Sequence, residues 1–293
     1  MKKVSSLQRS LNRSARACLP VLVSIALALV IGLSFAGRAS NAPFGGCVPI
    51  NPGSPPPNLG PVTVKATSGV LGPTDYSTVK AAFDAINAGT HQGLITIWIL
   101  DDTVETTSAV LTGNVPPASH AAILMLPSGT RTISGNLAAP LIDLSGASCV
   151  TIDGLGTGGN SLTISNTNTS NTAGTSTIRF INGAQNDTVK NAKLLGSSRV
   201  PVGAAGGTIL FHTTNTGSGN SFNTISNNDI WPASVNYPSK GISAVGTTTN
   251  ASTINNTNLI DGNRIGDFFG DGTNSTSGIV VRTGNRGWTI CNN

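Results

Sequence analysis

Three short stretches in the second half of the chain share a pattern that decides the fold. They are TVKNAKL at 188–194, TISNNDI at 224–230 and LIDGNRI at 259–265. In each, an aliphatic residue is followed by Asn or Gly two positions later and by a second aliphatic residue five positions later. The first aliphatic residues, Val189, Ile225 and Ile260, are 36 and 35 residues apart, and Ile290 follows after another 30. A recurring unit of this size predicts a repeat architecture.

Another short apolar run precedes each of these stretches. The partner runs are residues 178–180, 209–211, 242–244 and 279–281, and an earlier, less regular copy covers 141–154. Partner and anchor lie 11, 16, 18 and 11 residues apart, so the strands keep their pattern while the loops vary. Strands that cannot bury an apolar face alone predict a solenoid of coils stacked about 4.8 Å apart. Asn suits the corners because it tolerates left-handed backbone and can hydrogen-bond along the stack.

Only one segment has helical periodicity, at residues 77–88. Val79, Ala82, Phe83 and Ile86 recur at helical spacing and predict one buried face. Thr74, Asp75 or Ser77 can cap the start, and Gly89 follows the end, where glycine is favoured. We expect this helix to cover the exposed edge strand and open core of the first coil.

Two coil motifs, NTISNN at 223–228 and IDLSGA at 142–147, carry a resemblance to a known group. With them, the stretch 62–293 resembles the right-handed parallel β-helix proteins of the pectate-lyase-like superfamily. The stretch 76–87 is similar to the cap of large exported bacterial β-helix proteins. The resemblance implies an all-β right-handed parallel β-helix with an N-terminal capping helix. It implies no single activity, because the superfamily includes lyases, hydrolases, esterases and adhesins.

The alternative folds are an antiparallel β-sandwich and a propeller. Both need tight hairpins, and hairpin signals such as Asp261-Gly262 and Asp271-Gly272 do occur. These signals fall at inconsistent places within the repeats, so the stacking pattern favours the solenoid.

The N-terminal region has the sequence features of an export signal. Residues 1–42 combine six basic residues and no acid with an apolar run from Leu19 to Ala36 and small residues at Ser40-Asn41-Ala42. We predict a cleaved signal peptide, with an uncleaved anchor as the alternative because the run approaches the length of a membrane span. Removing those six from the 17 basic residues leaves 11 against 12 acidic ones, near −1. Nucleic-acid binding is therefore not expected, and the leader is the expected membrane contact.

Residues 43–61 are rich in proline and predict a semi-rigid linker before the domain at 62–293. Beyond the leader the chain has three cysteines, Cys47, Cys149 and Cys291, an odd number that leaves their pairing open. We interpret Cys149 and Cys291 as isolated buried residues. The coil register places them about four coils apart, too far for a disulfide. The last six residues begin another coil motif, so we expect a C-terminal truncation.

Composition favours a secreted or cell-surface protein in a non-catalytic role, contacting glycans or acting as a scaffold. The mature chain is near neutral, rich in Ser, Thr and Asn, and shows no convergent catalytic set. The alternative is a polysaccharide-active enzyme, a lyase or a glycoside hydrolase, which would need clustered or paired carboxylates. Trp231, Tyr237 and Trp288 could stack on sugars. Oligomeric state is left open.

Two candidate sites follow from this pattern. Arg179, His212 and Arg282 lie at outward positions of the partner strands and predict a basic groove for an acidic glycan. Asp267, Asp271 and Asn274 form an acidic cluster in a glycine-containing loop. Oxygen ligands of this kind suit Ca²⁺, although the spacing fits neither an EF-hand nor a glycine-rich nonapeptide. No other cofactor is expected.

Overall fold

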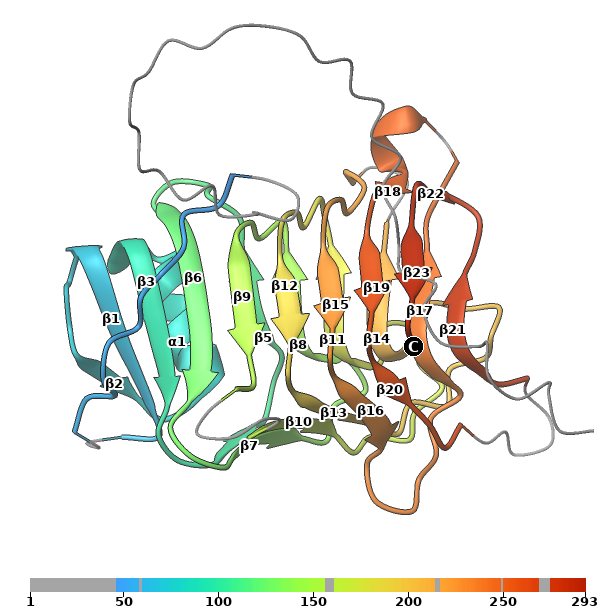
Figure 1. Ribbon diagram of the computed structural model, residues 1–293, viewed down its shortest axis with the longest axis horizontal. Helices are drawn as coiled ribbons and strands as arrows, with labels where there is room; N and C mark the ends of the chain where they lie inside the picture. The colour runs from blue at the N-terminus through green and yellow to red at the C-terminus, as the bar shows by residue number, and fades with distance from the viewer. Residues whose placement is uncertain (1–45, 58–59, 156–160, 214–216, 249, 269–274) are drawn as a thin grey trace, which may run out of the picture. The chain divides into compact units, whose positions relative to one another are not determined.

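The computed structural model describes residues 46–57, 60–155, 161–213, 217–248, 250–268 and 275–293, and these form one compact unit. The chain winds into a parallel β-solenoid of about five turns (Figure 1). This confirms the predicted all-β parallel β-helix. Within the described residues, no helix has both the length and the apolar character needed to cross a bilayer.

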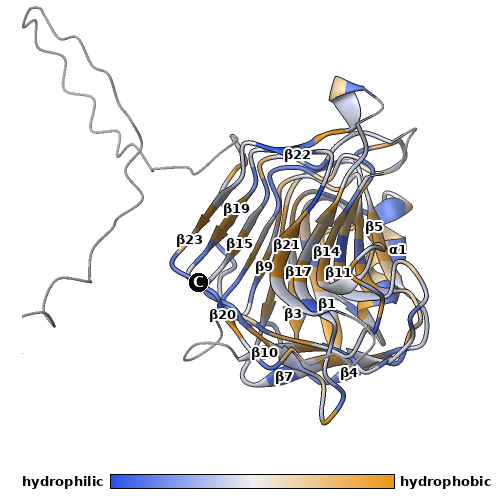
Figure 2. Cartoon of the chain, turned by 90° about the vertical axis from the view of Figure 1, so that its right-hand side faces the viewer, coloured by the Kyte–Doolittle hydropathy of each residue, from blue (hydrophilic) through white to orange (hydrophobic). Residues whose placement is uncertain are grey.

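Three sheets make up the sides of the coils (Figures 1 and 2). Sheet A contains β1 (Val62–Gly69), β2 (Thr74–Tyr76), β3 (His91–Ile99), β6 (His120–Pro127), β9 (Val150–Asp153), β12 (Thr188–Lys190), β15 (Thr224–Ser226), β19 (Leu259–Asp261) and β23 (Thr289–Cys291). Sheet B contains β4 (Thr103–Glu105), β7 (Arg131–Gly135), β10 (Leu162–Asn166), β13 (Lys193–Gly196), β16 (Asp229–Pro232) and β20 (Arg264–Ile265). Sheet C contains β5 (Ala109–Thr112), β8 (Pro140–Ser145), β11 (Ser176–Ile181), β14 (Gly207–His212), β17 (Lys240–Val245) and β21 (Ser277–Val281). A two-stranded sheet D joins β18 (Asn255–Asn256) to β22 (Asn285–Arg286), next to a short 3₁₀ helix, η1 (Ala251–Thr253).

The predicted register is confirmed strand by strand. Val189, Ile225, Ile260 and Ile290 pair in sequence along sheet A. The partner runs pair in the same way along sheet C, from Ile178 onward. Inward aliphatic side chains therefore stack into continuous columns, and Figure 2 shows hydrophobic segments on the strands around the interior. Each buried aliphatic side chain contributes about 1.5–3 kcal/mol, so the columns are the main source of stability.

Asn and Gly define one corner of the coils that follow β12, β15, β19 and β23. The residue two positions after each anchor has positive φ, as seen at Asn191, Asn227 and Gly262. The following position holds a buried Asn ladder, in which the Nδ2 of Asn228 donates to the Oδ1 of Asn263 at 3.0 Å. Parallel ladders have the same geometry at two more corners, from Asn223 to Asn258 and from Asn220 to Asn255. Stacked amides thus satisfy buried backbone and side-chain groups along the axis.

The N-terminal end is closed by α1 (Val79–Asn87), whose buried residues are those predicted from the sequence. The side chain of Asn87 accepts from the Thr112 N–H at 3.0 Å and donates to the Val110 carbonyl at 2.8 Å, both on β5. Since β5 is the edge strand of sheet C, α1 covers that edge, as expected.

Two acceptors, neither of them predicted, bind the start of α1. The cap residue is Thr78, whose hydroxyl accepts from Ala81 N–H at 3.1 Å, so the predicted caps at positions 74, 75 and 77 were wrong. The carboxylate of Glu105 also accepts from Val79 N–H at 2.9 Å and Lys80 N–H at 3.0 Å. A buried anion at a helix N-terminus satisfies unpaired donors and complements the helix dipole.

Replacing Glu105 by Ala is expected to lower the free energy of unfolding by about 3 kcal/mol, because two N–H groups lose a charged acceptor. Urea denaturation measures this change. Val104→Ala on the same strand is the control, since Val104 is 66% exposed. If both variants unfold at the same urea concentration, Glu105 contributes nothing through the helix.

Candidate functional site

The predicted basic residues lie on the outer face of sheet C, but not in one column. Arg179 pairs with Leu210 on the next coil, whereas His212 pairs with Val245. The assumption that Arg179 and His212 occupy equivalent positions is therefore wrong by two residues. Arg179 precedes Phe180, whereas His212 follows Phe211, and these two phenylalanines pair with each other on neighbouring coils.

Both arginines are bound by other groups of the protein. The guanidinium of Arg179 forms two hydrogen bonds to buried Asp143, from Nε at 2.9 Å and from Nη2 at 2.6 Å. Arg282 donates from Nη1 to the Val202 carbonyl at 2.8 Å. The bidentate pair neutralises the charge that an acidic ligand would need.

The surroundings of His212 disfavour its charged form. Burial lowers its pKa, Arg179 lowers it further, and Asp143 partly opposes both effects. Within the described residues, its buried Nδ1 has no hydrogen-bond partner. The structure thus places these three residues in more than one column and gives both arginines partners within the protein, while the basic groove and its contact with a glycan stay predictions.

A loop between β13 and β14 covers part of the same face. Leu210 points outward from sheet C yet is fully buried, as is Val200 in the loop. The ammonium group of Lys240 donates to the carbonyls of Pro201 and Ala204, both at 2.8 Å. Burial, together with nearby Arg282, lowers the pKa of Lys240 to about 8. The loop therefore closes this face from solvent.

The predicted calcium loop is only partly within the described residues. Asp267 follows β20 and is exposed, while Asp271 and Asn274 lie outside the described residues. In the part of the chain that the structure describes, no group of three or more His, Cys, Asp or Glu side chains could hold a metal ion. Calcium binding at this loop remains a prediction.

A different site, which the sequence did not predict as a whole, is an open groove of about 600 Å³ on the outer face of sheet B, across β13, β16 and β20. It is lined by Lys193, Leu195, Asp229, Trp231, Pro232, Ser234, Tyr237, Arg264 and Asp267. We call it the sheet B groove. Because successive coils supply β13, β16 and β20, the groove runs along the solenoid axis.

Trp231 forms the aromatic surface of this groove. Leu195 pairs with Trp231 on the next coil. A β-carbon at Gly266 would lie 2.5 Å from the indole ring, so only glycine leaves room for the ring in this position. Tyr237, 44% exposed, lines the groove from the loop that follows β16. Two partly exposed aromatic rings beside polar groups suit a ligand with both apolar and hydroxyl faces.

Charged side chains of both signs form a second column beside the aromatic one. Lys193, Asp229 and Arg264 pair in register on three successive coils. Arg264 lies 3.4 Å from the Asp229 carboxylate and 6.0 Å from the centre of the Trp231 ring. Its side chain is 75% exposed, so screening leaves this ion pair weak and the guanidinium available to a ligand.

The sequence pointed to three residues of this groove. Trp231 and Tyr237 were predicted to stack on sugars and Asp267 to bind calcium, but Lys193, Asp229 and Arg264 were not predicted as site residues. A signal was present, because Lys193, Asp229 and Arg264 all directly precede the second aliphatic residue of the coil motif. Comparisons of the chain with protein-family models, with curated proteins and with solved structures find no match. The structure supports the parallel β-helix fold, and these comparisons give no support for the pectate-lyase-like superfamily.

Proposed function

We propose that this chain is an exported β-helix protein, related in fold to the pectate-lyase-like superfamily, that binds glycans in the sheet B groove. The observation that carries the proposal is the juxtaposition of Trp231 and Tyr237 with Lys193, Asp229 and Arg264. Aromatic rings pack on the apolar faces of sugar rings, while charged and amide groups hydrogen-bond their hydroxyls.

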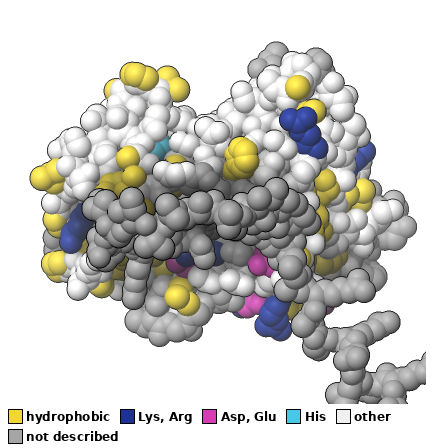
Figure 3. Space-filling view, turned by 45° about the horizontal axis from the view of Figure 1, so that its top comes forward, with side chains coloured by type: hydrophobic (Ala, Val, Ile, Leu, Met, Phe, Trp, Pro, Cys, Tyr) yellow, Lys and Arg dark blue, Asp and Glu magenta, His cyan; other side chains and the backbone are white. Residues whose placement is uncertain are grey.

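Two further observations support this role. The described surface in Figure 3 is mostly uncharged, with few Lys, Arg, Asp or Glu side chains, as suits contact with a hydroxyl-rich polymer. The leader-like N-terminus and a disulfide between Cys47 and Cys149 support export, because disulfides persist in oxidising compartments.

The test uses purified residues 43–293 with a panel of neutral and acidic polysaccharides, with and without Ca²⁺. Replacing Trp231 by Ala is expected to weaken binding roughly tenfold, since a lost stacking contact is worth about 1 kcal/mol or more. Gly266→Ala should weaken binding as well, because the new methyl group would displace the indole. Val235→Ala is the control, a 79% exposed residue that does not line the groove. Equal binding by Trp231→Ala and Val235→Ala would refute the proposal.

The same samples distinguish binding from catalysis. Asp229 and Asp267 both line the groove, and paired carboxylates are what glycoside hydrolysis requires. Newly formed reducing or unsaturated ends that disappear in Asp229→Asn or Asp267→Asn would make the protein an enzyme. Binding without new ends would support the adhesive or scaffold role.

A further inference from the structure

An apolar strip lies on the outer face of sheet A, far from the groove in sequence. Ile97, Ile99 and Met125 point into the core, so the alternating residues Trp98 and Leu126 point outward. Trp98 and Leu126 pair in register. Both are nevertheless buried, at 5% and 9% exposed, and they form a separate cluster with Leu100 and half-buried Leu124. Outward apolar side chains stay buried only when another segment covers them.

The segment that crosses this face is residues 46–57, the part of the proline-rich region that the structure describes, and we infer that it covers the strip. Figure 1 shows it crossing the outer side of β6 and β3 on its way to β1. The residues of this segment that are at least partly buried include apolar ones: Pro56 is buried, and Ile50 and Pro52 are half-buried. Val48, by contrast, is 49% exposed. We call these residues the strap.

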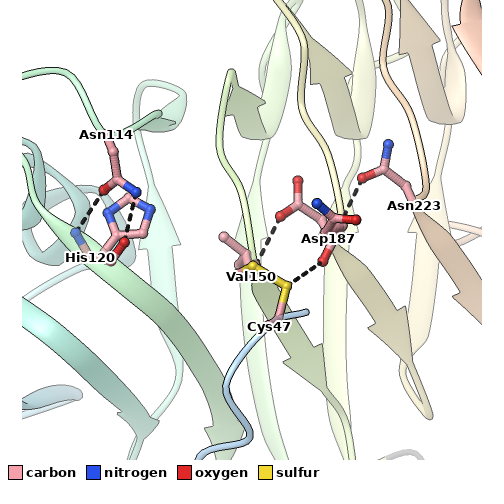
Figure 4. Close-up of a disulfide and its surroundings, with 8 residues drawn as sticks. Cys47, Asn114, His120, Val150, Asp187 and Asn223 are labelled. Carbon is pink, nitrogen blue, oxygen red and sulfur yellow. Dashed lines mark hydrogen bonds between the residues drawn. A yellow bond between two sulfur atoms is a disulfide. The ribbon is translucent and has the colours of Figure 1, made fainter. Parts of the chain in front are cut away.

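The strap is fixed at its two ends. At one end, Cys47 is joined to Cys149 by a disulfide with the Cα atoms 5.4 Å apart (Figure 4), so the interpretation of Cys149 as an isolated residue was wrong. Composition could not show this, because the partner lies 102 residues away. At the other end, the carbonyl of Pro61 accepts from Leu100 N–H at 2.8 Å and from Asp101 N–H at 3.1 Å.

Between these ends, the described residues show no hydrogen bond from positions 48–57 of the strap to sheet A. Among the described residues, positions 48–57 form one hydrogen bond, which is internal and runs from Gly53 N–H to Asn51 Oδ1 at 3.2 Å. Proline has no N–H to donate, which explains why the segment forms no strand with β6. The disulfide is therefore the covalent restraint on the strap, and neither of its cysteines is fully buried.

We propose that residues 46–57 form a redox-released strap over the apolar strip of Trp98, Leu100 and Leu126. A thiolate of a dithiol reductant attacks one sulfur of the Cys47–Cys149 bond and forms a mixed disulfide. The second thiol of the reductant then resolves it. The products are two cysteine thiols and the oxidised reductant. The strap then leaves sheet A and exposes the strip, while the Asn ladders and the core keep the coils folded.

Hydroxyl-radical footprinting with mass spectrometry tests this, because it reports the exposure of individual side chains. Three forms of the full chain are compared: oxidised; reduced with dithiothreitol, alkylated and desalted; and the variant Cys47→Ser. We expect oxidation of Trp98 and Leu126 to rise several-fold in the second and third forms. Trp231 and Trp288 serve as internal controls and should not change. Cys291→Ala, which alters a residue outside this disulfide, should behave like the oxidised wild type.

Two results would overturn the proposal. Continued protection of Trp98 in both altered forms would mean that packing alone holds the strap. A parallel rise at Trp288, which packs against Phe211 in the core, would mean that the disulfide stabilises the whole fold and does not control a strap.

Discussion

Replacing Asp187 by Asn is expected to stabilise the fold at pH 8 and to remove much of its dependence on pH. The Asp187 side chain is fully buried beside the Cys47–Cys149 disulfide (Figure 4). Its Oδ1 accepts from Val150 N–H at 2.9 Å, while its Oδ2 has no hydrogen-bond partner among the described residues. Burial raises the pKa of Asp187 to about 8, and the hydrogen bond from Val150 opposes this only in part.

The sign of the effect follows from proton binding. The folded-state pKa lies above the unfolded value of 3.8, so between about pH 4 and pH 8 the folded state holds one more proton. The contribution of Asp187 to the free energy of unfolding is fully present below the unfolded-state pKa. It is lost as pH rises through the folded-state pKa. The free energy of unfolding should fall by at most about 1.4 kcal/mol per pH unit, on the order of 5 kcal/mol in total.

An Asn at position 187 avoids this loss because it cannot ionise. It would also extend the ladder of Asn223 and Asn258, since the Oδ1 of Asn223 already accepts from the Asp187 N–H at 3.0 Å. Urea denaturation of the oxidised protein at pH 5, 6.5 and 8 measures the effect. Asp84→Asn, at a carboxylate 54% exposed on α1, is the control and should follow the wild type. Parallel pH curves for wild type and Asp187→Asn would contradict the prediction.

Replacing Asn228 by Ala is expected to lower the free energy of unfolding by about 4 kcal/mol, since several buried polar groups lose their partners together. The Oδ1 of Asn228 accepts from Ala192 N–H at 3.0 Å. Its Nδ2 donates to the Val189 carbonyl at 2.9 Å and to the Asn263 Oδ1 at 3.0 Å. Ala cannot replace any of these contacts, and no water reaches the site easily because Asn228 is 1% exposed.

The neighbouring residue provides a matched control for the ladder. Asn227 is exposed and has φ of 54°, a conformation that glycine adopts without strain. Asn227→Gly should therefore change stability by less than about 0.5 kcal/mol. Both variants are measured by urea denaturation at pH 6.5. If Asn228→Ala were as stable as Asn227→Gly, the ladder would not contribute as inferred.

Much of the fold could be predicted because its determinants are local and repeated. The alternation around Val189, Ile225 and Ile260 specifies which side chains face inward, and a slip of one residue would expose every one of them. The corner residues Asn227 and Gly262 stand where the chain needs left-handed backbone. Helix α1 was predictable for the same reason, since its buried face shows in the spacing of four residues.

The candidate sites were less predictable because they depend on which loops cover which faces. Arg179 and Arg282 look free in the sequence, but Asp143 and the Val202 carbonyl bind them. Trp231 and Tyr237 were recognised, yet the groove exists only because Gly266 on the next coil leaves space for the indole. Outward positions could be aligned only through the register of the strands, which pairs Arg179 with Leu210 and leaves His212 two residues further along.

The sequence by itself determined the coil, its register, its Asn corners and its capping helix, because short-range alternation and turn chemistry act within each repeat. Only the tertiary structure decided that Cys149 bonds to Cys47, that Glu105 binds the start of α1 and that burial raises the pKa of Asp187. The disulfide and the Glu105 hydrogen bonds join residues that are far apart in the sequence, and the pKa of Asp187 depends on how deeply its side chain is buried. Both depend on distances in three dimensions, which the order of residues does not give.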